Sequence, residues 1–158
     1  MKKMQWTQKE TLLLKDLVNA EQVCIEKYAD YADRACDEEL RSLFESIRTV
    51  EEGHLNTLEQ MENGTIPAMN AQGGSQQNQQ NGGSGNSGKQ KNNRSCEEDE
   101  FLCRDALDSE KHVSSLYDTC IFEFVSQQAR DVLNHIQKEE QEHGKRLYDY
   151  MSAHGMTA

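Results

Sequence analysis

The sequence predicts an all-helical fold, a bundle of four helices of roughly 25 residues each. Three observations favour this class. Apolar residues recur every three or four positions in four separate stretches, no stretch alternates apolar and polar residues over a useful strand length, and the two halves of the chain repeat each other. The length of 158 residues suits a single domain.

The first helical hairpin is expected over residues 7–62. The apolar stripe of its first helix consists of Leu13, Leu17, Ala20, Cys24, Tyr28, Tyr31 and Ala35. An acidic turn at 36–39 separates it from a second stripe, which consists of Leu40, Leu43, Ile47, Val50 or Glu51, His54, Leu58 and Met61. The pair Asn63-Gly64 is a typical helix C-terminal cap, so we expect the hairpin to end there.

The second hairpin is expected over residues 96–154, with the same layout. Its first stripe consists of Leu102, Ala106, Ser109 or Glu110, Val113, Leu116 or Tyr117, Cys120 and Phe124. Its second stripe consists of Ala129, Val132 or Leu133, Ile136, Glu140, His143, Leu147 and Tyr150 or Met151. At an offset of 89 residues the two hairpins align without a gap, which indicates a duplicated helical hairpin.

Residues 63–95 join the hairpins and differ from both in composition. They hold seven of the ten glycines, the only proline and no acid, and they are rich in Gln and Asn. Such a segment lacks the apolar side chains that would offset its ordering entropy, so we expect a disordered crossover. In a bundle of two hairpins related by a twofold axis, a long crossover must connect opposite ends.

Charge and length exclude several roles. The net charge is −11, and because the crossover carries three basic residues and no acid, the remaining residues carry −14. A body so acidic repels phosphate backbones and anionic lipids, so we expect neither nucleic-acid binding nor membrane insertion. The basic start of the chain is followed by polar residues rather than an apolar core, so we expect no signal peptide and an intracellular protein.

The five cysteines form no Cys-x-x-Cys pair, which excludes a zinc ribbon and a rubredoxin-type iron site. In a reducing compartment we interpret them as small buried apolar residues, with cross-linking left open.

Six ionisable residues interrupt the apolar stripes, and a charge on a core face needs a partner or a proton. They are Glu21, Glu51, His54, Glu110, Glu140 and His143. Each half contains one Glu-x-x-His pair, which places both side chains on one helix face, and one glutamate 30 residues upstream of that pair. Four carboxylates and two imidazoles in a bundle core are the ligand set of di-iron and di-manganese proteins. We therefore expect two iron or manganese ions, and we expect the apparent pKa values of the four carboxylates to rise as a coupled set without metal.

The neighbouring acids Glu52, Glu139 and Glu142 are interpreted as solvated, because they lie off the histidine register or off the stripe, and His112 is expected outside the bundle. Tyr28 and Tyr117 lie seven residues after Glu21 and Glu110 on the same faces. Each could donate a hydrogen bond to a ligand carboxylate, or act as a radical or proton relay, or simply fill the core.

With these motifs the sequence resembles the ferritin-like superfamily, in the style of rubrerythrin and manganese catalase, over residues 10–62 and 97–153. The stretches from Ser109 to Tyr117, from Glu139 to His143 and from Tyr150 to Gly155 resemble the coat F proteins of bacterial spores. The resemblance implies a ferritin-like bundle associated with the spore coat. Without a rubredoxin-type cysteine module, a rubrerythrin-like reaction would need an external electron donor.

Three functions stay open at this stage. The first is a di-iron or di-manganese oxidoreductase acting on peroxide or dioxygen. The second is storage or sequestration of metal by an acidic body. The third is a structural coat component without catalysis. The partners that we expect are metal ions, with a second copy of the chain or other spore coat proteins as further candidates.

Overall fold

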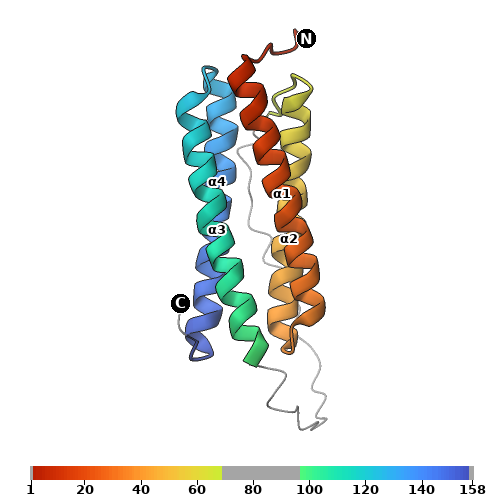
Figure 1. Cartoon of the computed structure of the whole chain (residues 1–158), viewed down its shortest axis with the longest axis vertical. Coiled ribbons are helices and arrows are strands. Elements are labelled where there is room, and N and C mark those ends of the chain that lie inside the picture. The colour runs from red at the N-terminus through yellow and green to blue at the C-terminus, as the bar shows by residue number, and fades with distance from the viewer. Residues whose placement is uncertain (1, 69–96, 157–158) are drawn as a thin grey trace.

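The computed structural model describes residues 2–68 and 97–156 and shows four long helices in these ranges. They are α1 (Gln8–Arg34), α2 (Glu38–Glu62), α3 (Glu97–Glu123) and α4 (Gln127–Ala153). The helices lie side by side along the long axis of the molecule, as Figure 1 shows. The predicted helical bundle is confirmed.

The hairpins are arranged so that the end of α2 and the start of α3 lie at opposite ends of the bundle (Figure 1). At one end the indole Nε1 of Trp6 donates a hydrogen bond to the carbonyl of Met61 at 2.6 Å. At the other end Arg34 pairs with Glu98. This is the topology that needs a long crossover. The crossover was expected to be disordered from residue 63, and this is wrong for residues 63–68, where the Met4 N–H donates to the carbonyl of Gly64 and Ile66 packs against the core. Residues 69–95 lie outside the described residues.

The helices begin and end at residues whose chemistry explains the boundary. Thr7 caps α1 through a capping box with Glu10, and the Ser126 side chain caps α4 by accepting from the backbone N–H of Ala129. After α2, Gly64 adopts a φ of +85°, and a Cβ there would lie 2.8 Å from the carbonyl oxygen of Met4. Glycine is required at this position for both reasons.

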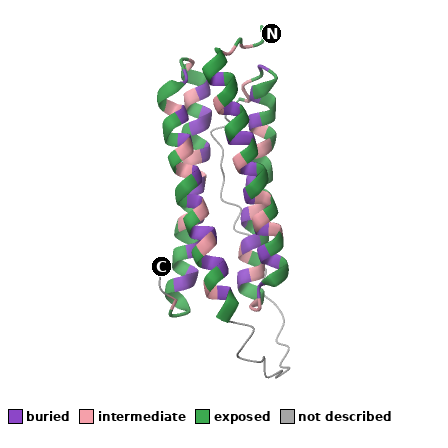
Figure 2. Cartoon of the chain, viewed as in Figure 1, coloured by how far each residue is buried: buried purple, intermediate pink, exposed green. Residues whose placement is uncertain are grey.

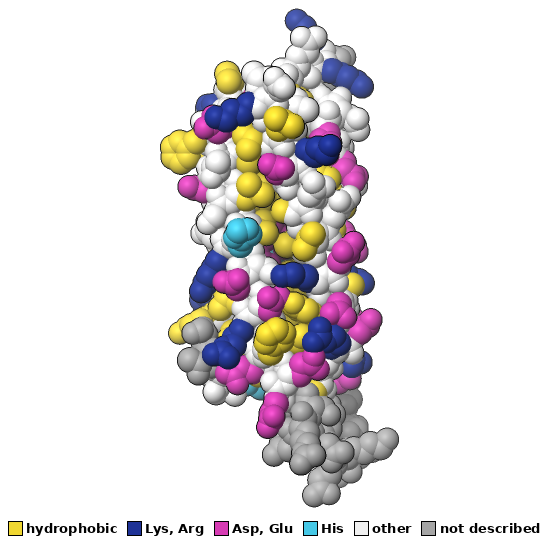
Figure 3. Space-filling model, in the orientation of Figure 1, with side chains coloured by type: hydrophobic (Ala, Val, Ile, Leu, Met, Phe, Trp, Pro, Cys, Tyr) yellow, Lys and Arg dark blue, Asp and Glu magenta, His cyan; other side chains and the backbone are white. Residues whose placement is uncertain are grey.

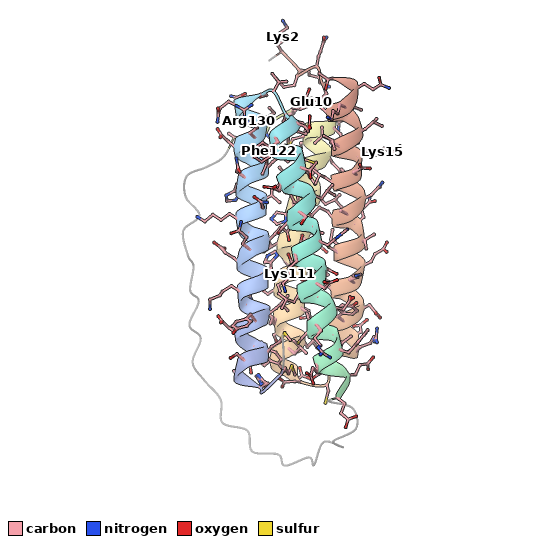
Figure 4. The ribbon with its side chains drawn as sticks, turned by 60° about the vertical axis from the view of Figure 1, so that its left-hand side comes forward. Lys2, Glu10, Lys15, Lys111, Phe122 and Arg130 are labelled. Carbon is pink, nitrogen blue, oxygen red and sulfur yellow. The ribbon has the colours of Figure 1, made fainter. Side chains whose placement is uncertain are left out.

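Two buried acids, Glu10 and Asp99, clamp the bundle at its ends and are related by the 89-residue offset. Glu10 Oε2 accepts from the backbone N–H of Val125, in the turn between α3 and α4, at 3.2 Å. Asp99 Oδ1 accepts from the backbone N–H of Cys36, in the turn between α1 and α2, at 2.8 Å. Each hairpin therefore holds the turn of the other. Figure 4 shows Glu10 at the same end of the bundle as Phe122 and Arg130.

The apolar core is divided into two clusters along the bundle. The clusters lie on opposite sides of the predicted site residues along each helix, and the one exception is Cys24, which follows Glu21 but belongs to the cluster that precedes it. On α2, for example, Ile47 belongs to one cluster and Leu58 to the other. The buried faces meet along the inside of the bundle in Figure 2. A polar layer therefore lies at mid-height between two apolar layers.

The predicted stripes are correct in register but imprecise at their edges. Leu13 and Ala20 were expected in the core and are only half-buried, whereas Leu14 and Phe44 are fully buried. An apolar face broader than a single line of residues explains the difference, because a bundle helix contacts two neighbours at once.

Cys24, Cys103 and Cys120 are buried in the core as free thiols, as expected for small apolar residues. Among the described residues, no helix combines the length and the apolar character that crossing a membrane requires. Acidic and basic side chains are intermixed over the face of the bundle in Figure 3, so the net negative charge does not form one continuous patch on that side.

We predict that replacing Glu10 by alanine lowers the free energy of unfolding by about 2–3 kcal/mol, because the change removes a buried acceptor from the N–H groups of Thr7 and Val125. Urea denaturation followed by circular dichroism measures the change. The matched control is Glu10→Gln, whose amide oxygen still accepts a hydrogen bond and whose loss should be smaller. Equal stability of Glu10→Ala and wild type would contradict the clamp.

Candidate metal centre

The six predicted site residues converge in the polar layer at mid-height. Glu21 comes from α1, Glu51 and His54 from α2, Glu110 from α3, and Glu140 and His143 from α4. All six are buried, and none is more than 4% exposed. Two groups of possible ligand atoms form among them: Glu21, Glu51, His54 and Glu140 make one, and Glu51, Glu110, Glu140 and His143 make the other.

Glu51 and Glu140 belong to both groups because each directs one oxygen to either histidine. His54 Nδ1 lies 3.2 Å from Glu51 Oε2 and 2.9 Å from Glu140 Oε1. His143 Nδ1 lies 2.9 Å from Glu51 Oε1 and 3.5 Å from Glu140 Oε2. Each of these two carboxylates therefore lies between the two histidines, where a carboxylate that bridged two ions would lie. The distances to the remaining glutamates, 3.8 Å from His54 to Glu21 and 3.5 Å from His143 to Glu110, place those two as terminal groups.

The two tyrosines bind the terminal glutamates crosswise between the hairpins. Tyr117 of the second hairpin donates to Glu21 Oε1 at 2.6 Å, and Tyr28 of the first donates to Glu110 Oε1 at 2.5 Å. Burial, together with the charge of the carboxylate that each contacts, raises the pKa of both phenols well above the usual value. Both tyrosines therefore keep their proton and serve as donors that fix the terminal carboxylates.

Without metal, the two histidines carry the positive charge that the buried acids need. Burial opposes protonation of His54, but its hydrogen bonds to three carboxylates outweigh this and raise its pKa to about 12. The same balance raises the pKa of His143 to about 11. Burial likewise opposes ionisation of Glu51 and Glu140, yet hydrogen bonds from neighbouring side chains, both imidazoles among them, lower their pKa values. Two imidazolium ions thus face two carboxylates.

The terminal glutamates behave in the opposite way. Burial, reinforced by the neighbouring carboxylates, raises the pKa of Glu21 well above its usual value and that of Glu110 to about 9. The expectation that all four carboxylates would shift upward together is therefore wrong for the bridging pair. The reason is that Glu51 and Glu140 each contact both imidazoles. Glu21 and Glu110 each contact only one, and each lies beside one of the ionised pair.

The chemistry of this donor set fits two divalent ions. One oxygen each of Glu21, Glu110 and Glu140 is buried and has no hydrogen-bond partner in the described part of the chain. A buried carboxyl oxygen without a partner is costly unless a proton or a cation satisfies it, and a cation would replace the protons that Glu21 and Glu110 hold. Hard oxygen ligands with one imidazole per position suit iron and manganese equally.

Glu139 corrects one expectation, because it is not a purely solvated neighbour. Its Oε1 lies 3.3 Å from His54 Nε2 and 2.9 Å from His135 Nε2, and its side chain is 32% exposed. The spacing of four residues from His135 was a usable signal for a helix-face pair, but contact with His54 on another helix could not be read from spacing. Glu52, Glu142 and His112 are exposed, as expected.

Comparisons with known proteins agree with this architecture. Residues 98–158 match the family model described as the Coat F domain. A crystal structure from Anabaena variabilis, of a two-domain protein containing DJ-1/ThiJ/PfpI-like and ferritin-like domains, aligns with 94% of this chain at a TM-score of 0.66 and 16% identity. This chain spans 38% of that protein, so the likeness concerns the fold. No curated protein matched the chain. The resemblances to the coat F proteins and to the ferritin-like fold are confirmed.

We predict that the metal-free protein loses stability as the pH rises from about 5 to 9. The pKa of Glu110 is about 9 in the folded state against 4.5 for an ordinary glutamate, so the folded state holds a proton that the unfolded chain has released. Unfolding free energies measured in chelator across this range should fall. In Glu110→Gln the fall should be shallower, because the amide does not titrate. A slope that is the same in both proteins would contradict the shift.

Proposed function

We propose that this chain, whose residues 98–158 match the Coat F domain, is a spore-coat-associated ferritin-like protein that binds two iron or manganese ions in its bundle core. One observation carries the proposal: Glu51 and Glu140 each direct one oxygen to either histidine, which is the arrangement of carboxylates that bridge two ions. The ferritin-like fold and the orphaned oxygens support it.

In this proposal Glu21 and His54 hold one ion and Glu110 and His143 hold the other, with Glu51 and Glu140 shared. When bound, two such ions would supply electron transfer to peroxide or dioxygen. The chain's own contributions are positional. Tyr117 and Tyr28 fix the terminal carboxylates by hydrogen bonds, and the apolar layers above and below exclude water from the rest of the core.

Binding should require the release of protons. The imidazoles must lose the protons that they hold at neutral pH, and the terminal glutamates must lose theirs as well. We therefore expect metal affinity to rise with pH over the neutral range.

The first test is metal analysis of the protein purified from its native host, together with thermal unfolding. We predict about two ions per chain, and a stabilisation of about 2.7 kcal/mol per site at a free metal concentration 100 times Kd. Chelation should reverse the stabilisation. The variant Glu51→Ala should lose most of the bound metal, because one bridging ligand serves both positions, and the exposed substitution His112→Ala is the matched control. A melting temperature that neither metal nor chelator changes would contradict the proposal.

The second test separates catalysis from a structural role. The loaded protein is assayed for consumption of peroxide and of dioxygen. Turnover that Glu51→Ala abolishes would assign an oxidoreductase, whereas two bound ions without turnover would assign a metal-stabilised coat component.

A further inference from the structure

The two halves of the metal centre are alike in their six ligands but not in the groups behind the histidines. His54 Nε2, the nitrogen directed away from the carboxylates of the centre, contacts Glu139 at 3.3 Å. Glu139 is in turn held by His135 at 2.9 Å. A carboxylate of α4 thus supports the histidine of α2.

The 89-residue offset shows what takes the corresponding place behind His143. Glu139 corresponds to Val50, and His135 corresponds to Ser46. An apolar residue therefore has the equivalent sequence position, and among the described residues His143 contacts no carboxylate besides Glu51, Glu110 and Glu140. Ser46 is engaged differently, since its hydroxyl accepts a hydrogen bond from Arg146 at 3.0 Å. The two halves therefore share their ligand residues, but the first half has no carboxylate equivalent to Glu139.

The protein surface near the two histidines also differs between the halves. A groove of about 380 Å³ lies over His54, between α2 and α4 and the segment that follows α2. Its lining includes Gly53, Thr57 and Glu139. At Gly53 an added Cβ would meet nothing within 4 Å. The residue that corresponds to Thr57 in the other half is Arg146, whose side chain reaches across to Ser46. The groove therefore adjoins the His54 side of the centre, although both imidazoles are buried to a similar extent.

The chemical effect of the Glu139 contact follows from which group can donate a hydrogen bond and which can only accept one. An ionised carboxylate can only accept a hydrogen bond, so the proton of a neutral His54 must reside on Nε2. The lone pair is then on Nδ1, the nitrogen that faces the ligand carboxylates. A carboxylate behind a ligating histidine also orients the ring and increases its basicity, and loss of such a partner typically costs 10–100-fold in metal affinity.

We infer that Glu139 is a positioning residue for His54 and that it makes the two metal positions unequal, so that the ion held by Glu21 and His54 binds first and more tightly. This inference rests on the proposed function. It goes further by assigning an order of filling to two positions whose ligands are identical in type.

The test uses Zn²⁺ alone as a diamagnetic probe of the full-length protein. Isothermal titration gives the affinities, and ¹⁵N-histidine NMR reports which imidazole changes first and which nitrogen carries the proton. In the wild type we expect two affinities that differ by about 10–100-fold, with the His54 signals changing before those of His143. The His54 signal should show a protonated Nε2 in the loaded state.

Three variants and a control locate the cause. Glu139→Val copies the other half and should bring the two affinities together by weakening the first. Glu139→Gln retains an acceptor and should restore the order of filling in part. Val50→Glu adds the missing carboxylate and should strengthen the second position. The control Glu142→Gln removes an exposed acid beside His143 and should leave both affinities unchanged. Circular dichroism verifies folding, and if Val50→Glu does not fold, the two Glu139 variants decide the question.

The outcomes distinguish this inference from the proposed function. If neither His54 nor His143 responds to Zn²⁺, the metal centre itself is wrong and the inference falls with it. If both respond at the same Zn²⁺ concentration in the wild type and in Glu139→Val, the centre stands and the inequality is overturned. Filling of His143 before His54 would overturn it as well.

Discussion

The pairing of two buried imidazoles with two shared carboxylates is the interaction on which the rest of this structure depends. Four carboxylic acids at the centre of an apolar bundle would repel one another if all were ionised. Here His54 and His143 neutralise Glu51 and Glu140, while Glu21 and Glu110 keep their protons. The polar layer is thus close to electrically neutral before any cation enters. This balance lets one bundle hold both a packed core and a concentrated set of ligands.

The duplication explains why the layer is so regular and where regularity stops. Contacts repeat between the halves at equivalent positions, as when Tyr117 binds Glu21 and Tyr28 binds Glu110. Away from the axis of the bundle the two copies differ, because Val50 and Glu139 occupy equivalent places. The repeated ligands and tyrosines would suit a reaction in which the two ions play equal roles. The difference between Glu139 and Val50 would suit a process in which one ion binds before the other.

Much of the fold and the six-residue set could be predicted from the sequence, because both depend on local spacing. A Glu-x-x-His pair on an apolar stripe must point into the core. Because the pair is repeated in the second half, few other arrangements of the six residues are possible. The remainder depends on contacts between helices. Glu139 lies beside Glu140 in the sequence, and nothing in the spacing indicates its contact with His54. The pKa of Glu51 is lowered by hydrogen bonds with Glu21 and His143, which lie on two other helices. Phe44, by contrast, lies four residues after Leu40 and three before Ile47, so spacing alone could have placed it in the core.

The reciprocal clamps at the two ends have a consequence for the history of the molecule. Glu10 holds the turn of the second hairpin and Asp99 holds the turn of the first, so each turn relies on an acceptor from the other hairpin for part of its hydrogen bonding. Two copies of a single hairpin would satisfy both clamps in trans and would also assemble the full set of carboxylates and imidazoles across their interface. The present chain therefore has the arrangement that two such hairpins would have if they were joined into one polypeptide.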